Sequence, residues 1–167
     1  ELASGLVGKG RMAEPETIAR AISEFFWKEK HLFQGKKILI TAGPTYEMID
    51  PVRFIGNFSS GKMGVALANV ATSMGAEVTL VLGPTPPHEI DPRVRVVSVV
   101  SAAQMYEATT TAFTHTDIAI LAAAVADYKP QEQAPEKIKK KTDTLTLTLV
   151  KTQDILASLG KSKQQQL

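Results

Sequence analysis

Residues 38–64 read I-L-I-T-A-G-P-T-Y-E-M-I-D-P-V-R-F-I-G-N-F-S-S-G-K-M-G, and this stretch decides the fold of the chain. An apolar run of β type leads into a long loop rich in Gly, Pro, Ser and Asn, and a segment with helical apolar spacing follows the loop. Strand-to-helix connections usually take only about 2 to 6 residues, so the length of this loop favours a functional role. An ordinary connecting loop is the alternative, and composition alone does not separate the two.

The end of this loop, Ser59-Ser60-Gly61-Lys62, carries residue types that bind anions. The first turn of a helix presents unpaired backbone N–H groups and a partial positive charge, and glycine lets an anion approach the backbone closely. Two hydroxyl groups and a cation stand at the same place. The sequence therefore predicts a phosphate or carboxylate ligand at the start of this helix.

Two familiar nucleotide-binding motifs do not match here. Residues 56–63, G-N-F-S-S-G-K-M, have the spacing of a P-loop, but Met63 stands where a Ser or Thr must bind magnesium. No G-x-G-x-x-G follows the first strand, and the next strand ends in Val81-Leu82-Gly83-Pro84, without an acid for a ribose hydroxyl. Both mismatches indicate a phosphate loop of another kind.

The composition is that of an ordinary globular chain, with 167 residues, 44% hydrophobic and 22% charged. The formal net charge is only +2, and the basic residues are spread out apart from a cluster at 137–141, so nucleic acid is not expected. The absence of cysteine excludes disulfides, thiolate metal sites and a cysteine nucleophile from this chain, and it fits a cytoplasmic protein. No apolar run reaches the roughly 18 residues of a membrane span. The three histidines, His31, His88 and His115, lack the spacing of metal ligands.

Apolar runs and helical patterns alternate along residues 37–124, which predicts a doubly wound, Rossmann-like α/β fold with a mostly parallel sheet. The apolar stripe Met63, Leu67, Val70 and Met74 is expected to be the packed face of its helix. The expected elements are strands over 37–41, 78–82, 94–100 and 118–124, and helices from Pro15, over about 61–74, and after a capping box at Ser101–Gln104.

The C-terminal part departs from this alternation. Residues 127–141 are polar and charged, and residues 144–150 alternate Thr and Leu, which predicts a half-buried antiparallel strand. Thr152 is expected to cap a last helix. That helix carries the apolar residues Ile155, Leu156 and Leu159.

In open α/β sheets, ligands bind beyond the carboxyl ends of the strands. Asp127 directly follows the apolar run 118–124 and is well placed to reach a ligand hydroxyl, base or metal ion; a turn cap is the alternative. Lys137 and its neighbours can screen a polyphosphate, although a lysine run is more often a solvated surface. The Asn57 amide can donate to a developing oxyanion, or Asn57 is only a turn residue. Three loops leave strand ends of this kind: 42–60, 83–92 and 126–140.

Three motifs resemble a known family, the phosphopantothenate-cysteine ligase domain of the bacterial bifunctional flavoprotein of coenzyme A biosynthesis. They are the 38–64 stretch, A-A-A-V-A-D-Y-K-P at 122–130, and A-P-E-K-I-K-K at 134–140. The resemblance implies a ligase domain over 36–167 that is incomplete at its C-terminus, because family members continue past Leu167. A buried strand at 118–124, so near the end of the sequence, agrees with that expectation.

Residues 1–35 resemble the tail of the decarboxylase half of the same flavoprotein, with its substrate-covering flap, a helix and a linker. Many members carry a cysteine in this flap, whereas this chain reads Ala3-Ser4-Gly5. The FMN-binding body is not present in this sequence. We therefore expect no decarboxylation and no FMN from this chain.

The resemblance implies a reaction between 4'-phosphopantothenate, cysteine and CTP, with Mg²⁺. The pantothenate carboxylate attacks the α-phosphate of CTP to give an acyl-cytidylate and pyrophosphate, and the amine of cysteine then displaces CMP. A homodimer is implied, as is a decarboxylase half in the full-length chain, and neither nucleic acid nor membrane is expected as a partner. Whether CTP or ATP is preferred stays open.

The resemblance also assigns roles to residues. Asn57 and Lys137 are the catalytic candidates. Those expected on the nucleotide are Gly43, Ser59, Ser60, Gly61, Met63, Asp127, Lys137, Gln153, Asp154, Ile155 and Leu156. Those expected on the acyl substrate are Arg53, Asn57, Ala123 and Ala124, with a dimer contact as the alternative for Arg53. The family's N-P-D-I-type segment reads T-Q-D-I at 152–155, and the missing proline weakens its match.

Two other functions remain as hypotheses. A non-catalytic nucleotide-binding or assembly module would bind CTP without releasing pyrophosphate or forming a cysteine adduct. An NAD(P)-type oxidoreductase lacks its glycine fingerprint and its ribose acid here, and enhancement of NADH fluorescence on titration would support it.

Overall fold

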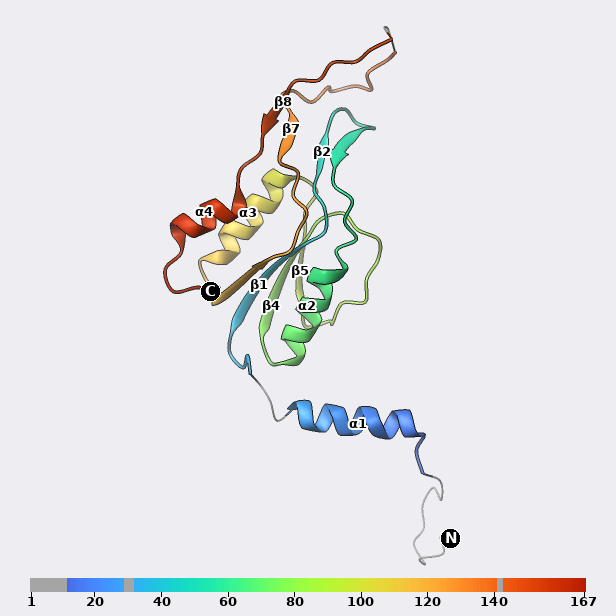
Figure 1. Cartoon of the computed structure of the whole chain (residues 1–167), viewed down its shortest axis with the longest axis vertical. Helices are drawn as coiled ribbons and strands as arrows, with labels where there is room; N and C mark the ends of the chain where they lie inside the picture. Colours follow the sequence, from blue (N-terminus) through green and yellow to red (C-terminus); the bar gives the residue numbers. More distant parts are fainter. Residues whose placement is uncertain (1–11, 29–31, 141–142) are drawn as a thin grey trace, which may run out of the picture. The chain divides into compact units, whose positions relative to one another are not determined.

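The computed structural model describes residues 12–28, 32–140 and 143–167. The chain divides into two compact units, 1–32 and 33–167. In the first unit, α1 (Pro15–Lys28) begins at the expected proline, whose missing N–H costs nothing at a helix start (Figure 1). The flap at Ala3-Ser4-Gly5 lies outside the described residues. The boundary expected after residue 35 lies close to this division, and the assignment of the first part to a decarboxylase half stays a prediction.

The second unit is built on a four-stranded parallel sheet. Its strands are β1 (Lys37–Ala42), β4 (Glu77–Leu82), β5 (Arg95–Ser98) and β6 (Ile118–Leu121), in the order β5-β4-β1-β6. One face carries α2 (Lys62–Ser73), and the other carries α3 (Ala102–Phe113) and α4 (Ile155–Ser162) (Figure 1). Alternate residues of β1 pack on opposite faces of the sheet. Ile38 and Ile40 belong to the core beneath α2, and Leu39 belongs to the core beneath α3 and α4. The predicted doubly wound α/β fold is confirmed.

Two small antiparallel hairpins lie beyond the carboxyl ends of the sheet strands (Figure 1). The first pairs β2 (Tyr46–Met48) with β3 (Phe54–Gly56), and the second pairs β7 (Tyr128–Pro130) with β8 (Leu149–Lys151). Strand β2 lies against β7 and is fixed to the start of α3, where the buried Glu47 carboxylate accepts from the Ala102 N–H at 2.7 Å. The antiparallel addition near the C-terminus is therefore confirmed.

The helix ends agree with the sequence patterns. The capping box of α3 forms as predicted, with the Ser101 hydroxyl accepting from the Gln104 N–H. Helix α2 ends before Gly75, whose φ of 92° suits the left-handed turn that follows a helix.

The prediction of the packed face of α2 was wrong. Met63 is 65% exposed and Val70 is 50% exposed. The face against the sheet is instead formed by Gly64, Val65, Ala68, Ala71 and Thr72. The small residues let the helix approach the sheet closely: a Cβ built on Gly64 would lie only 2.4 Å from the Cβ of Ala42.

Three further predictions need correction. The run 118–124 is not a buried strand, because β6 ends at Leu121 and is half-buried at the side of the four-stranded sheet. The strand expected over 144–150 is confined to β8, because ladder pairing with β7 begins only at Leu149, and before it only the Thr148 carbonyl is bonded, by the Gln131 N–H at 2.9 Å. The cap of α4 is Asp154 rather than Thr152.

Candidate functional site

A cavity of about 560 Å³ lies where the segment after β6 meets the segment before α4. Six residues predicted to contact ligand line it: Ala123, Asp127, Gln153, Asp154, Ile155 and Leu156. Sequence analysis missed the remaining lining residues, Thr41, Leu121, Val125, Tyr128, Lys151 and Thr152. The cavity thus lies at the carboxyl ends of β1 and β6, where ligands of α/β sheets bind.

Two short segments are tied together at this cavity. The Thr152 hydroxyl donates to the Ala126 carbonyl at 2.7 Å, and the Thr152 N–H donates to the Asp127 carbonyl at 2.9 Å. Asp154 turns back onto its own helix and accepts from the Ala157 N–H at 2.8 Å. The Asp127 side chain is exposed, so its carboxylate is available at the wall of the cavity.

The predicted phosphate loop forms a compact corner at the start of α2. Gly61 is the N-cap residue with φ of 73°, a conformation that residues with a Cβ rarely adopt. A Cβ on Gly61 would lie 2.9 Å from Cγ2 of Thr85 and 3.4 Å from the Gly43 nitrogen, so Gly43 and Gly61 are close neighbours. The Ser59 hydroxyl oxygen lies 3.4 Å from the Gly61 nitrogen and accepts its hydrogen.

The loop after β4 covers this corner, which sequence analysis did not foresee. His88 Nε2 donates to the Ser60 carbonyl at 2.7 Å, and Thr85 packs against Gly43 and Gly61. The side chain of Met63 is exposed at the helix start. The backbone N–H groups of the first helical turn have no partner within their own helix, which is the feature that anions use.

Asn57 lies between the corner formed by Gly43 and Gly61, here called the glycine corner, and the cavity. Its Nδ2 donates to the carbonyls of Ala124 at 3.3 Å and Val125 at 3.0 Å, and the Ala124 N–H donates to the Gly43 carbonyl at 2.8 Å. Val125 lines the cavity. The Asn57 side-chain amide is therefore held by two backbone carbonyls.

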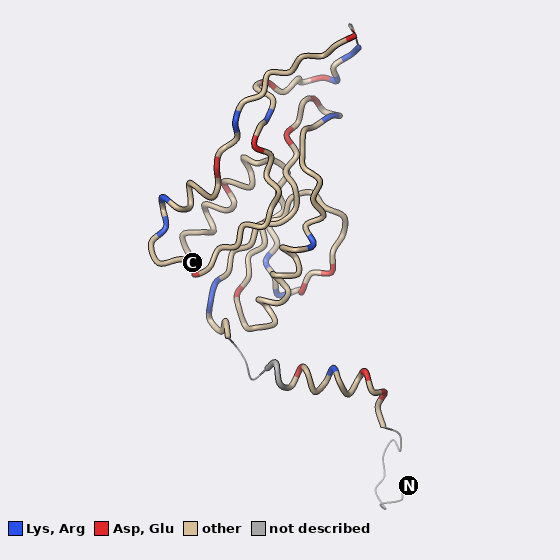
Figure 2. Tube along the Cα trace, in the orientation of Figure 1, with Lys and Arg blue, Asp and Glu red and all other residues tan. Residues whose placement is uncertain are grey.

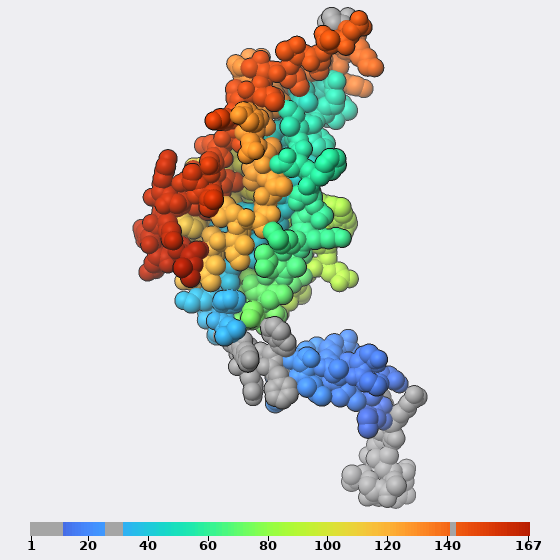
Figure 3. Space-filling view, viewed as in Figure 1, coloured from blue at the N-terminus to red at the C-terminus, as the bar shows by residue number. Residues whose placement is uncertain are grey.

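Arg53 and Lys137 lie apart from the cavity. The Arg53 guanidinium contacts the Asp50 carboxylate and the Ile138 carbonyl, and the Lys137 side chain is exposed. Neither residue lines the cavity of 560 Å³. Both basic and acidic residues lie along the extended arm, which is described over residues 131–140 and 143–148 (Figure 2). This arm and the first hairpin pack side by side beyond the end of the sheet (Figure 3).

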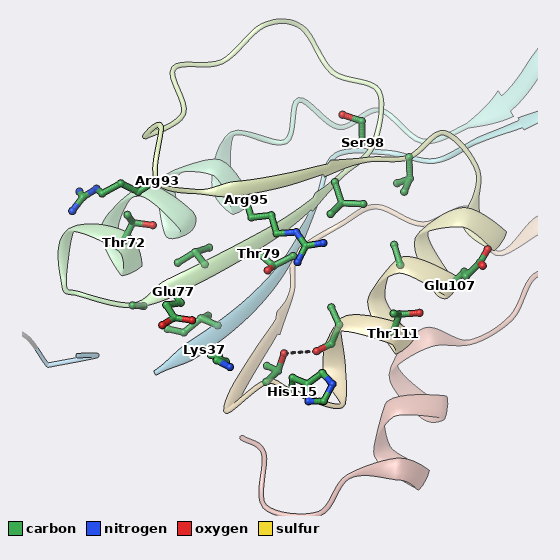
Figure 4. Close-up of a pocket in the computed structure, with 18 of the residues that line it drawn as sticks. Lys37, Thr72, Glu77, Thr79, Arg93, Arg95, Ser98, Glu107, Thr111 and His115 are labelled. Carbon is green, nitrogen blue, oxygen red and sulfur yellow. Dashed lines mark hydrogen bonds between the residues drawn. The ribbon is translucent and has the colours of Figure 1, made fainter. Parts of the chain in front are cut away.

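A larger cavity, of about 1080 Å³, lies along the side of β4 and β5 that faces α3 (Figure 4). It extends to the N-terminal ends of β1 and β4, at Lys37 and Glu77, and Arg95 of β5 lies over its register partner Thr79 of β4. Its lining mixes basic and acidic side chains. It reaches the carboxyl end of β5 at Ser98 but extends mainly toward the other end of the sheet, so we assign the candidate site to the smaller cavity.

Among the described residues, no group of three or more His, Asp or Glu side chains is arranged to hold a metal ion. Within the same residues, no helix is long and apolar enough to cross a membrane.

A family model described as the DNA/pantothenate metabolism flavoprotein C-terminal domain matches residues 33–167. The chain is 54% identical over 167 residues to a protein named Cysteine/Cysteine sulfinic acid decarboxylase from an unknown prokaryotic organism, covering 98% of this chain and 46% of that protein. It is 46% identical over 164 residues to the Coenzyme A biosynthesis bifunctional protein CoaBC of Haemophilus influenzae, covering 96% of this chain and 40% of the relative. The chain therefore spans less than half the length of these relatives.

Solved structures agree with these matches. The crystal structure of the C-terminal domain of a Coenzyme A biosynthesis bifunctional protein CoaBC superposes with a TM-score of 0.72 at 48% identity, covering 82% of this chain and 64% of that one. A Cab2 variant in complex with phosphopantothenate-cysteine superposes with a TM-score of 0.62 at 20% identity, covering 90% of this chain and 68% of that one, which shows a shared fold.

Proposed function

The chain belongs to the family of the DNA/pantothenate metabolism flavoprotein C-terminal domain, and we propose that it is the ligase part that joins 4'-phosphopantothenate to cysteine in coenzyme A biosynthesis. Relatives that share about half of its residues are named as bifunctional proteins of that pathway. The observation that carries the proposal is the convergence of the glycine corner, Asn57 and the Asp127 cavity at one end of the sheet.

The proposed reaction has two steps. The carboxylate of 4'-phosphopantothenate attacks the α-phosphorus of CTP, and the bond to the leaving pyrophosphate breaks. The amine of cysteine then attacks the acyl carbon, loses a proton, and displaces CMP to leave an amide. Negative charge accumulates in both steps, so oriented N–H groups and a cation are the groups that this chemistry requires.

The described residues divide these tasks between three places. The N–H groups of the first turn of α2, which follow Gly61, would face phosphate oxygens, with Ser59 and Ser60 beside them. Asp127 would accept from the sugar or the base at the cavity, next to the segment 153–156. Lys137 would reach the phosphates from the arm.

Mg²⁺ is proposed as a companion of the triphosphate. The described residues offer carboxylates at the cavity, Asp127 and Asp154, but no group of three ligands. Mg²⁺ commonly binds through one or two carboxylates, water and substrate phosphates, which this arrangement allows. When bound, it would neutralise phosphate charge.

One relative is named as a decarboxylase, but residues 33–167 of this chain match the model of the C-terminal domain of the flavoprotein family. We therefore do not extend decarboxylation to this chain. Because the chain spans less than half the length of these relatives, the second candidate function is that of a nucleotide-binding domain whose active site is completed by another segment. A homodimer and a cytoplasmic location remain predictions from the family resemblance.

The test supplies the chain with CTP, Mg²⁺, 4'-phosphopantothenate and cysteine and measures pyrophosphate and the cysteine adduct separately. The ligase proposal expects pyrophosphate only when 4'-phosphopantothenate is present, and the adduct only when cysteine is added. Binding of CTP without either product favours the second candidate.

Asp127→Asn is expected to weaken CTP binding about tenfold, the loss of one hydrogen bond to a charged acceptor. CMP binding should weaken equally, because Asp127 is assigned to the sugar or base and not to the outer phosphates. Calorimetric titration measures both. Glu132→Gln is the control, since Glu132 is exposed and lies outside the cavity. Loss of CTP affinity with unchanged CMP affinity would move Asp127 to the phosphate side.

A further inference from the structure

We infer that Asp50 and Arg53 are positioning residues that clamp the Ile138 peptide to the first hairpin and thereby hold Lys137 in place for the triphosphate. The inference rests on the proposed function, because the role of Lys137 comes from there. Asp50 had no predicted role, and Arg53 was predicted to contact substrate.

The clamp begins with a buried carboxylate. Asp50 is 0% exposed. Its Oδ1 accepts from the N–H groups of Val52 and Arg53, each at 2.8 Å, and its Oδ2 accepts from the Arg53 guanidinium. The nearby guanidinium holds the pKa of the Asp50 carboxyl well below its usual range. The carboxylate is therefore charged and fully hydrogen-bonded across the pH range in which enzymes work.

The same two side chains bind the backbone N–H and C=O groups of one residue that is distant in sequence, Ile138. The Ile138 N–H donates to Asp50 Oδ2 at 3.1 Å, and Arg53 Nη2 donates to the Ile138 carbonyl at 2.9 Å. These contacts join positions 85 and 88 residues apart in the sequence. An ion pair that only stabilised the turn would not need to extend to Ile138.

A second contact fixes the arm four residues earlier. The Ala134 N–H donates to the Ile49 carbonyl at 2.9 Å. Between the two anchors lie Pro135, whose ring fixes φ, and the exposed Lys137. The chain on both sides of Lys137 is thus held to the first hairpin, while the lysine side chain remains free to bind.

This arrangement reduces the conformational freedom that an exposed lysine loses on binding. Ordering a loop and a long side chain costs free energy at the moment of binding, and a pre-ordered backbone removes part of that cost. The hairpin that carries the clamp also continues through β3 into Asn57, so the arm and the glycine corner share one support.

The test measures amide hydrogen exchange by NMR in Asp50→Asn and Arg53→Met. Asp50→Asn replaces one carboxylate oxygen by an NH₂ group, which cannot accept the hydrogen bonds that Asp50 accepts. Arg53→Met removes the guanidinium that donates to the Ile138 carbonyl but keeps the volume of the aliphatic part of the side chain. We expect exchange at Ile138 to rise at least about tenfold, with α2 amides unchanged as proof of folding. Asp91→Asn is the matched control, because the Asp91 carboxylate also pairs with a nearby arginine, Arg93, and that pair lies on the loop after β4, away from Ile138.

The functional readout is the ratio of CTP to CMP affinity, with Lys137→Gln for comparison. Lys137→Gln should lower this ratio without changing exchange at Ile138, and the two clamp variants should change both. Unchanged exchange at Ile138 in both folded clamp variants overturns the inference. The inference is also overturned if Lys137→Gln lowers the ratio of CTP to CMP affinity while the two clamp variants speed up exchange at Ile138 without changing that ratio. If Lys137→Gln itself leaves the ratio of CTP to CMP affinity unchanged, the assignment of Lys137 in the proposed function fails, and the inferred positioning role fails with it. Amide exchange at Ile138 would still show whether Asp50 and Arg53 hold this residue.

Discussion

Gly83→Ala is expected to lower the free energy of unfolding by about 3 kcal/mol or more, the upper part of the range for overpacking. A Cβ on Gly83 would lie 1.8 Å from the Pro44 carbonyl oxygen and 2.9 Å from its carbon. These are backbone atoms, so no side chain can rotate away. The Gly83 N–H also donates to the Ala42 carbonyl at 2.9 Å, which holds Gly83 against the loop after β1.

The predicted effect on thermal unfolding is a decrease in Tm of roughly 6 to 12 °C for a chain of this size. Displacement of Pro44 would also disturb the neighbouring Gly43, so the CTP affinity of the folded fraction should fall. Gly160→Ala is the control. Gly160 lies within α4 with nothing within 4 Å of a built Cβ, so alanine there should raise the free energy of unfolding by about 0.5 to 1 kcal/mol. A Gly83→Ala variant as stable as the wild type would show that the loop after β1 does not make this close contact.

Asn57→Asp is expected to reduce amide formation at least about 100-fold, a loss typical of removing one donor to a developing oxyanion. The substitution replaces the Nδ2 donor by an oxygen that faces the carbonyls of Ala124 and Val125. Pyrophosphate release should persist, because the phosphate groups are assigned to the glycine corner and not to Asn57. The measurement compares pyrophosphate and cysteine adduct formed by the same preparation.

Asn69→Asp is the matched control for this variant. Asn69 also donates from Nδ2 to a carbonyl, that of Glu89 at 2.9 Å, and its Oδ1 accepts from the Asp91 N–H. It lies outside the candidate site, so both half-reactions should be retained. Equal loss of pyrophosphate and adduct in Asn57→Asp would limit Asn57 to holding the Ala124–Val125 segment.

The sequence predicted features that depend on local patterns. The alternation of apolar runs and helical spacing is set by residues near one another in the chain, and it correctly predicted the doubly wound sheet. The capping box at Ser101 and the end of a helix near residue 74 are equally local. The rule that ligands bind at the carboxyl ends of strands favoured Asp127, the family resemblance added the segment 153–156, and both line one cavity.

The predictions that failed depended on partners distant in sequence. Size and hydrophobicity favoured Met63 and Leu67 as the packed stripe of α2, but the helix lies so close to the sheet at Gly64 that a face of smaller residues packs there instead. The clamp at Asp50 joins residues across more than 80 positions, and no local pattern reports such a contact. Thr85 and His88 were missed for the same reason, since they reach the glycine corner from a different loop.

Calorimetric titration of the chain with CTP, and separately with ATP, in the presence of Mg²⁺ tests the central claim most directly. The account predicts one saturable nucleotide site per chain, with CTP affinity lowered by Asp127→Asn, and the comparison with ATP measures the base preference. No binding of either nucleotide to the folded chain would contradict the claim that the glycine corner and the Asp127 cavity together form a nucleotide site.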